Sequence, residues 1–355
     1  MCSSDLKKDE KAAVGRKTSI GGQALIEGIM MRGPGKIAMA VRRPNGEIFF
    51  EEQENKAKKR PAICRFPIIR GVFGFIDSIV LGYRCLSRSA EIFCEEPELQ
   101  TGENEAQDAP CEAEKAADTA EATAETPKKE KENKSGGIGK GAITAVTTLA
   151  AVLGFALVLV LFVWFPAFLF EKIPFPPSLA SHRLFRSAFE GILKVMLLVG
   201  YMAAVSLMKD IRRTFMYHGA EHKTIFCYEH GQPLTVENVR AQRRFHPRCG
   251  TSFLILMLLV SILVGMFIPL SFPGITSKLL YTLLRSAIKI ALIPLIMGIG
   301  YELLKFAGRH DNILTKIISA PGLWLQRITV REPTDDMIEC AIMAFKAVVP
   351  PDESD

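Results

Sequence analysis

The 355-residue sequence predicts a mainly α-helical, polytopic membrane protein with about four transmembrane helices, a small N-terminal β-hairpin element and a cytoplasmic helical loop. Long runs without charged residues predict the membrane helices, because the core of a bilayer needs about 20 consecutive apolar residues in a helix. The concentration of basic residues in one connection between those runs predicts the cytoplasmic loop. An Asn-Gly pair between two short apolar segments predicts the hairpin.

These patterns divide the chain into five regions. We expect a disordered N-terminus at residues 1–18, followed at 19–94 by a cytoplasmic region that holds the hairpin and an interfacial helix. Residues 95–140 are rich in Glu, Ala, Thr and Lys and have almost no aromatic residues, so they predict a disordered acidic linker. The membrane domain is expected at 141–307, and residues 308–355 predict a C-terminal cytoplasmic helical region.

Three segments of the N-terminal region have different expected structures. Residues 37–42 and 48–51 are the predicted strands of the hairpin, on either side of Pro44-Asn45-Gly46. Residues 21–35 contain so many glycines that we expect a loop whose backbone approaches another group closely. Residues 66–83 are apolar but shorter than the membrane runs, so we expect a helix at the membrane interface, with a fifth span as the alternative.

The transmembrane helices are predicted from four apolar runs, which we expect to pair as two hairpins: residues 142–170, 187–208, 249–277 and 286–301. The first and third runs contain no charged residue. Glu190 and Lys194 interrupt the second run near one end, where a long lysine side chain can reach the lipid headgroups.

The distribution of lysine and arginine predicts the orientation in the membrane. Residues 209–248 contain eight of them, whereas the connections at 171–186 and 278–285 contain few. Because cytoplasmic loops carry the basic excess, we expect residues 209–248 and both termini to be cytoplasmic in a multi-pass protein of the cell membrane. Membrane lipid is the expected partner. No stacking aromatic residues interleave with a basic stripe, so the sequence does not indicate a nucleic-acid partner.

The C-terminal region is expected to contain one packed amphipathic helix. Pro321-Gly322 predicts a break before it. Thr334-Asp335-Asp336 predicts the start of the helix, because Thr and Asp side chains cap free backbone N–H groups there. Apolar residues then recur at helical spacing: Met337, Ile338, Ala341, Ile342 and Phe345.

Two short motifs in and beside the cytoplasmic loop predict a metal site. His218 and His222 are four residues apart, so on a helix they share one face, with Glu221 beside them. The H-x-x-E-H order is that of metalloenzymes in which two histidines bind zinc and the glutamate activates water. His246 and Cys249 follow at a spacing that lets both reach one ion. The four side chains together are a tetrahedral ligand set that zinc accepts.

Four motifs in order resemble those of the bacterial membrane proteins called DUF1385 or YqhQ-like, which are described as predicted metal-dependent enzymes without a settled substrate. The motifs are Gly21–Gly33, Tyr217–Lys223, His246–Thr251, and Gly322–Arg327 followed by Glu332–Asp336. The resemblance extends over nearly the whole chain apart from the two polar stretches. It implies a membrane fold and a metal site, and it implies no particular reaction.

Candidate catalytic and substrate-binding residues are Glu221, Glu27 and Arg32. Either glutamate could activate water, and Arg32 could bind an anionic group of a substrate. Each also has a structural alternative: Glu221 as an ion-pair partner of Lys223 or an arginine, and Glu27 and Arg32 as members of an internal salt bridge.

Three function classes are compatible with these residues. Three protein ligands and an open fourth position on zinc or a similar divalent ion predict a metal-dependent hydrolase. Four protein ligands, His218, His222, His246 and Cys249, predict instead a membrane scaffold with a closed structural metal site. A transporter or channel is the third class, which the few charged residues within the membrane runs do not favour. Without a metal, the histidines would simply lie at the membrane interface beside Arg212 and Arg213.

Overall fold

The computed structural model describes the following residues: 18–55, 66–94, 152–269, 277–310 and 312–350, together with Pro61, Leu149 and Gly274. The predicted acidic linker at 95–140 and almost all of the predicted disordered N-terminus at 1–18 lie outside the described residues. The described part of the chain is mainly helical, with one β-sheet near the N-terminus.

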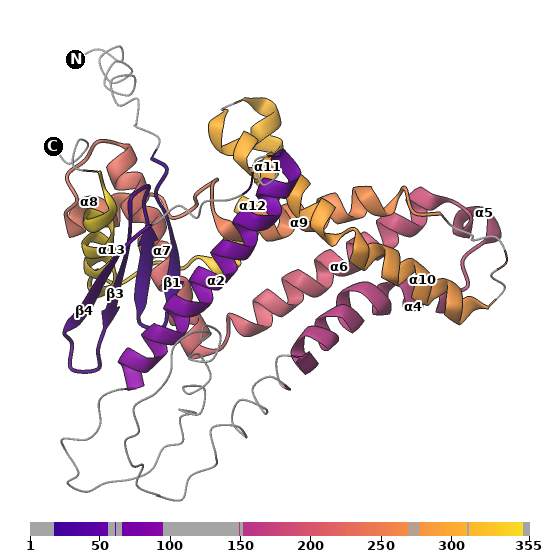
Figure 1. Ribbon diagram of the computed structural model, residues 1–355, viewed down its shortest axis with the longest axis horizontal. Helices are drawn as coiled ribbons and strands as arrows, with labels where there is room; N and C mark the ends of the chain where they lie inside the picture. The colour runs from indigo at the N-terminus through magenta and orange to yellow at the C-terminus, as the bar shows by residue number, and fades with distance from the viewer. Residues whose placement is uncertain are drawn as a thin grey trace, which may run out of the picture.

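The N-terminal sheet has four antiparallel strands in sequence order (Figure 1). They are β1 (Gly21–Leu25), β2 (Gly28–Arg32), β3 (Lys36–Arg42) and β4 (Ile48–Glu54). The predicted hairpin is confirmed as β3 and β4, with Gly46 at a φ of 90° in the turn between them. The predicted loop at 21–35 is wrong, because this segment forms the other two strands.

Glycines in the first two strands serve close packing. A Cβ on Gly22 would lie 2.7 Å from the Met30 carbonyl oxygen, and one on Gly28 would lie 2.5 Å from that of Ala40. Both distances are too short for a side chain, so only glycine fits at these positions of the sheet. Glu27 adopts a left-handed φ of 49° in the turn that joins the two strands. The glycine content therefore reflects a tightly packed sheet rather than a loop.

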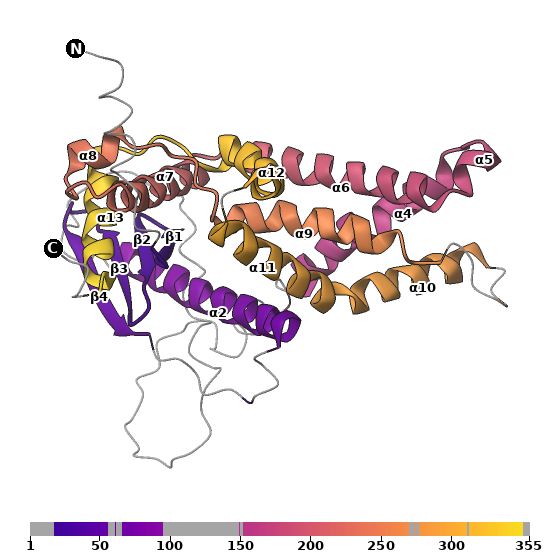
Figure 2. The same cartoon turned by 90° about the horizontal axis from the view of Figure 1, so that it is seen from above.

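Helices cover both faces of the sheet (Figures 1 and 2). Successive side chains of a strand point to opposite faces. Ile29 and Met31 accordingly belong to a core formed with α7 (Lys209–Glu229) and α13 (Asp335–Val348). Met30, on the other face, belongs to a core formed with α2, which comprises Pro67–Cys94. Because the central strands are buried on both faces, their sequence lacks the alternation that marks a half-exposed strand.

The C-terminal helices partly match the expectation. Thr334 precedes α13, which confirms the predicted helix start. The predicted break at Pro321-Gly322 is wrong, because α12 (Ile313–Thr329) continues through both residues. A Cβ on Gly322 would lie 2.4 Å from the Cβ of Ser252, so this glycine lets α12 pack closely against α9 (Gly250–Gly265). Tertiary packing therefore sustains a helix across residues that would end an isolated one.

A group of apolar helices extends away from the sheet (Figure 1). Two helices are long and apolar enough to cross a membrane, Val152–Lys172 and Arg183–Val205, and the second of these is α6. A third candidate is the pair formed by α10 (Lys278–Ala291) and α11 (Ile293–Arg309), if the two bent helices count as one span. The described residues therefore contain two or three candidate spans, and not four.

Helix breaks explain the difference from the predicted number. The predicted third run contains α9 (Gly250–Gly265), whose 16 residues extend over about 24 Å, less than the ~30 Å of a bilayer core. The predicted fourth run crosses a bend of 42° between α10 and α11, close to Pro294 in the first turn of α11. Apolar composition continues through these breaks, although the helices do not.

The charged residues of α6 also differ from the expectation. Glu190 and Lys194 are both buried inside the protein. Lys289 of α10 forms an ion pair with the Glu190 carboxylate, so this charge is paired between two helices. Lys194 therefore does not extend to the surface as a headgroup-seeking lysine would.

Candidate metal centre

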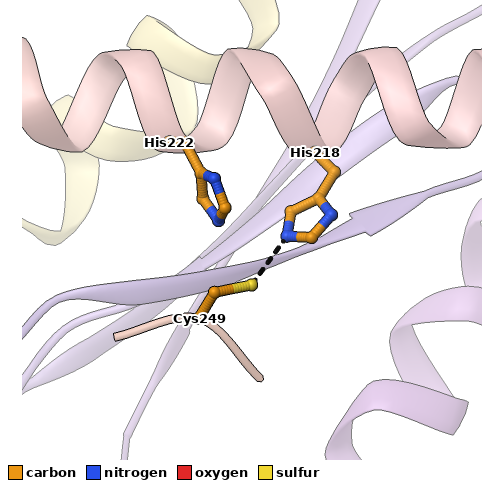
Figure 3. A group of neighbouring side chains, drawn as sticks. All are labelled: His218, His222 and Cys249. Carbon is orange, nitrogen blue, oxygen red and sulfur yellow. Dashed lines mark hydrogen bonds between the residues drawn. The ribbon is translucent and has the colours of Figure 1, made fainter. Parts of the chain in front are cut away.

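One face of α7 presents the two histidines of the predicted site toward Cys249 (Figure 3). His218 and His222 lie one helical turn apart on α7, and Cys249 is the residue that caps the N-terminus of α9. One ligand atom from each of the three residues lies within 4.8 Å of the other two. His218 Nε2 lies 3.0 Å from Cys249 Sγ. Packing of α7 beside the start of α9 thus assembles a three-residue donor set.

Backbone carbonyls determine which nitrogen of each histidine carries a proton. His222 Nδ1 lies 2.6 Å from the Arg244 carbonyl oxygen, and His218 Nδ1 lies 3.0 Å from that of Thr329. Because a carbonyl only accepts hydrogen bonds, both Nδ1 atoms must donate, and the lone pair of each neutral ring is then on Nε2. Metal-binding histidines are oriented by carbonyl partners in this way.

An unpaired atom at the centre of the group supports a ligand there. His222 Nε2 is buried and has no hydrogen-bond partner among the described residues. Buried polar atoms usually have a partner, so an unpaired one at a cluster of metal-ligand side chains indicates a missing ligand. The atom is a lone-pair donor, which a cation would satisfy.

The protonation states suit a divalent metal. Burial lowers the pKa of His222 and keeps the imidazole neutral. Burial alone would raise the pKa of Cys249, but the neighbouring His222 and hydrogen bonds with the backbone N–H and the hydroxyl of Thr251 hold it below its usual value. A position at a helix N-terminus also favours the thiolate. The nitrogens of two imidazoles and the sulfur of one thiolate form a donor set that fits zinc.

Glu221 lies beside this donor set and is buried. Its Oε1 accepts a hydrogen bond of 3.0 Å from the backbone N–H of Gly22 in β1. Burial raises the pKa of Glu221 to about 7, although the nearby His218 and the Gly22 N–H act in the opposite direction. Lys223, its alternative ion-pair partner, instead contacts Glu332 at 2.7 Å. Glu221 is therefore a carboxyl group that can gain or lose a proton near neutral pH.

His246 lies outside the three-residue group, although its ring centre is 5.6 Å from that of His222. Gln326 binds its backbone on both sides, accepting from its N–H at 2.9 Å and donating to its carbonyl oxygen at 2.7 Å. The ring Nδ1 accepts from the Arg248 N–H at 3.2 Å, and Nε2 lies 3.7 Å from a carboxylate oxygen of Glu229. The structure thus brings together three of the four predicted ligands and directs the fourth toward Glu229.

Glu27 and Arg32 lie outside the three-residue group. Glu27 forms an ion pair with Arg213 of α7 and accepts a hydrogen bond of 3.3 Å from the Tyr217 hydroxyl. This contact agrees with the salt-bridge alternative for Glu27, although its partner is Arg213 and not Arg32. Arg32 is half-buried at the end of β2, opposite Gly21 of β1. Glu27 links the sheet to α7 close to the metal centre.

Several residues that orient the site were not identified from the sequence. Arg244, Thr329 and Gly22 contribute only backbone groups, which no side-chain motif reveals. Gln326 is completely buried in α12, and its amide also donates to the Ser252 hydroxyl. An uncharged polar residue in an apolar helix was the one available signal for this role.

Comparison with known proteins identifies the family. A family model described as "Protein of unknown function (DUF1385)" matches residues 66–351. The "Uncharacterized protein YqhQ" of Bacillus subtilis (strain 168) is 35% identical over 331 residues, which cover 93% of this chain and 92% of that protein. No solved structure matches the chain. The match over most of both chains shows that this protein belongs to the DUF1385 family.

Proposed function

We propose that this protein is an integral membrane, metal-dependent hydrolase of the zinc type, with its site on the cytoplasmic side. The observation that carries the proposal is the buried, unpaired Nε2 of His222, which lies in one group with His218 and Cys249. Three protein ligands leave a fourth position for water or substrate, as catalytic zinc sites do. The orientation of His246 toward Glu229 supports three ligands rather than four.

Glu221 is the proposed catalytic residue. A divalent ion with three protein ligands lowers the pKa of a water molecule at its open position toward neutrality. Glu221 would accept the proton of that water and deliver it to the leaving group, which requires a carboxyl group that titrates near the working pH. Its pKa of about 7 and its place on α7 beside both histidines support this role. The Gly22 N–H holds Oε1 in position.

The proposed placement in the membrane rests on charge and connectivity. Arg183–Val205 is a candidate span, and it leads almost directly into α7, which carries both histidines. Residues 209–248 contain eight basic residues, so we assign this side to the cytoplasm. With an even number of spans, both termini would be cytoplasmic as well.

A structural metal site is the second candidate function. Its support is that the ligands come from two separate helices, since the histidines belong to α7 and Cys249 caps α9. An ion held between them would tie the cytoplasmic region to the membrane helices, and its binding energy would add to the stability of the fold. Glu221 would then have no chemical role.

Metal analysis of the purified full-length protein tests both forms of the proposal. We expect about one divalent ion per chain, and almost none in the His222→Ala variant, because two remaining ligands hold an ion weakly. His230→Ala is the matched control, since His230 is an exposed histidine at the end of the same helix. Wild-type protein that retains no ion after incubation with zinc, manganese, iron, cobalt or nickel would contradict both forms.

Glu221→Gln distinguishes the hydrolase from the structural site. The substitution keeps the shape and a hydrogen-bond acceptor for Gly22 but removes the ionisable group. In a hydrolase, metal content stays at the wild-type level while complementation of a strain that lacks the protein is lost. Full complementation by this variant, with metal bound, would favour the structural site.

A further inference from the structure

A second group of buried charged residues lies between α6 and α10, apart from the metal centre. Arg186, Glu190 and Lys194 recur every four residues on one face of α6, and Arg285 lies one turn before Lys289 on α10. Four of the five are almost completely buried, with exposed fractions of 5%, 3%, 7% and 1% for Arg186, Glu190, Lys194 and Arg285. Buried charges in membrane helices are costly and usually have a function.

Glu190 is shared among several cations. Lys289 Nζ donates to its Oε2, and Arg186 Nε donates to its Oε1 at 3.1 Å. Arg285 Nε lies 3.9 Å from the same Oε1, and Lys194 also experiences the charge of Glu190. One carboxylate has only two oxygens, so it cannot satisfy all of the donors around it.

Arg186 is held rigidly among neighbours. Its Nη1 lies 2.8 Å from a carboxylate oxygen of Glu171. Glu171 lies near the end of the first candidate span and directly follows Phe170. Its guanidinium carbon lies 4.8 Å from the centre of the Phe170 ring and 5.5 Å from that of Tyr281. A guanidinium fixed between two rings loses little further entropy when it binds a ligand.

The group has more positive charge than negative charge, and two of its donors are unpaired. The described residues supply two carboxylates, Glu171 and Glu190, against four cations. Arg186 Nη2 and Arg285 Nε are buried and have no hydrogen-bond partner among the described residues. Both atoms are N–H donors, so an anion with oxygen acceptors would complete the group.

We propose that this group, Arg186, Lys194, Arg285 and Lys289 around Glu190, binds a phosphate anion, either free or as the headgroup of an anionic lipid. Arginine forks match phosphate oxygens in two-point contacts, and lysines add point charge. The excess of two positive charges suits a phosphate that carries one or two negative charges. Arg186 lies 19 residues before the end of α6, about 28 Å along the helix, so this site is separate from the metal centre and its function goes beyond the proposed hydrolysis.

The first experiment measures phosphate binding to the purified full-length protein. Inorganic phosphate is titrated against potassium chloride of equal ionic strength, and lipid nanodiscs with phosphatidic acid are compared with nanodiscs of phosphatidylcholine alone. We expect Arg285→Gln to weaken binding at least about tenfold, because a buried charged donor is lost. Arg183→Gln is the matched control, since Arg183 is an exposed arginine in the first turn of the same helix, and its binding should equal that of wild type.

A second variant keeps the test informative if Arg285→Gln does not fold. Glu190→Gln removes the carboxylate that competes for the cations, so we expect phosphate to bind more tightly, by about tenfold. A response to inorganic phosphate identifies a free-anion site, and a response to phosphatidic acid alone identifies a lipid-headgroup site. Wild-type protein that responds to neither probe, or that responds equally with Arg285 replaced, would show that the cations only link the helices.

Discussion

Two buried polar groups lie toward the two ends of α6. One has an unpaired hydrogen-bond acceptor, and the other has unpaired hydrogen-bond donors. At the cytoplasmic end as proposed, the unpaired atom is His222 Nε2, a hydrogen-bond acceptor with a free lone pair, beside a thiol of lowered pKa. At the other end, the unpaired atoms are N–H donors of Arg186 and Arg285 among excess positive charge. A cation would satisfy the unpaired atom of the first group, and an anion would satisfy those of the second. The sign of the missing ligand thus follows from which hydrogen-bonding capacity is unfilled.

The two groups also differ in what holds them. Backbone carbonyls of Arg244 and Thr329 and the backbone N–H of Gly22 orient the residues of the metal centre. Side chains from α6 and α10 orient one another in the charged group. Backbone atoms move less than side-chain ends, so the metal centre should depend strongly on how α7 packs, and the charged group should tolerate small shifts of its helices.

The largest expected effect is a difference in reporter activity between the two ends of α6, which we place on opposite sides of the membrane. A reporter that is active only outside the cytoplasm should be active when fused after Ser181 and inactive when fused after His230, because the basic residues retain the second region inside. Enzymatic activity of the two fusions in intact cells measures this. Activity after His230 would place the metal centre outside and contradict the proposed orientation.

Substitutions in the two groups should affect metal binding and phosphate binding independently. His222→Ala should lose almost all bound metal while its response to phosphate stays at the wild-type level, and Arg285→Gln should do the reverse. The reason is distance, since about 28 Å of α6 separates Arg186 from the end of the helix that leads to α7. Metal content and phosphate titration on the same preparations measure both. If either substitution removed both ligands, the two groups would not be independent sites.

Two helix glycines test whether the metal centre is the more rigid region. A Cβ on Gly219 of α7 would lie 2.0 Å from the Arg331 carbonyl oxygen, whereas one on Gly191 of α6 would lie 2.6 Å from both Cδ1 and Cγ1 of the Ile262 side chain. Gly219→Ala should lower the free energy of unfolding by about 3 kcal/mol, because backbone must move. Gly191→Ala should change it by less than about 1 kcal/mol, because a side chain can rotate and alanine favours the helix.

Thermal or denaturant unfolding in detergent, read out by tryptophan fluorescence, provides the comparison. Metal content after Gly219→Ala gives a second measure, since displacement of α7 separates the ligands. Equal effects of the two substitutions would mean that packing at the two ends is similarly adaptable.

The smallest of these effects concerns the amide that holds His246. Gln326→Ala removes two hydrogen bonds to the His246 backbone and one to Ser252, so buried groups are left without partners. We expect a loss of about 2 kcal/mol in unfolding free energy. Gln53→Ala, at an exposed position of β4, should cost less than about 0.5 kcal/mol. A loss as small as that of the control would mean that water replaces the amide.

Local sequence patterns predicted the features that depend on near neighbours. The four-residue spacing of His218 and His222 places both on one face of any helix, and Asn45-Gly46 favours one kind of turn between strands. The helix start at Thr334 and the apolar run of α6 are likewise short-range signals. Each of these predictions is confirmed.

Features that depend on distant contacts were predicted less well. The orientation of His246 depends on Gln326 and Glu229, which are far from it in sequence or on another element. The strand character of residues 21–32 depends on burial of both faces, which removes the alternating pattern. The span count depends on bends that apolar composition does not record.

By itself, the sequence determined the family, the helical apolar character and, as candidate ligands, all three residues of the group formed by His218, His222 and Cys249. Only the tertiary structure decided that the fourth candidate ligand, His246, lies outside that group, and that the charges of α6 are buried against α10. The physical reason is range. Helix periodicity and turn preference act over a few residues, whereas the direction of a buried polar side chain depends on which donors and acceptors distant segments bring to it.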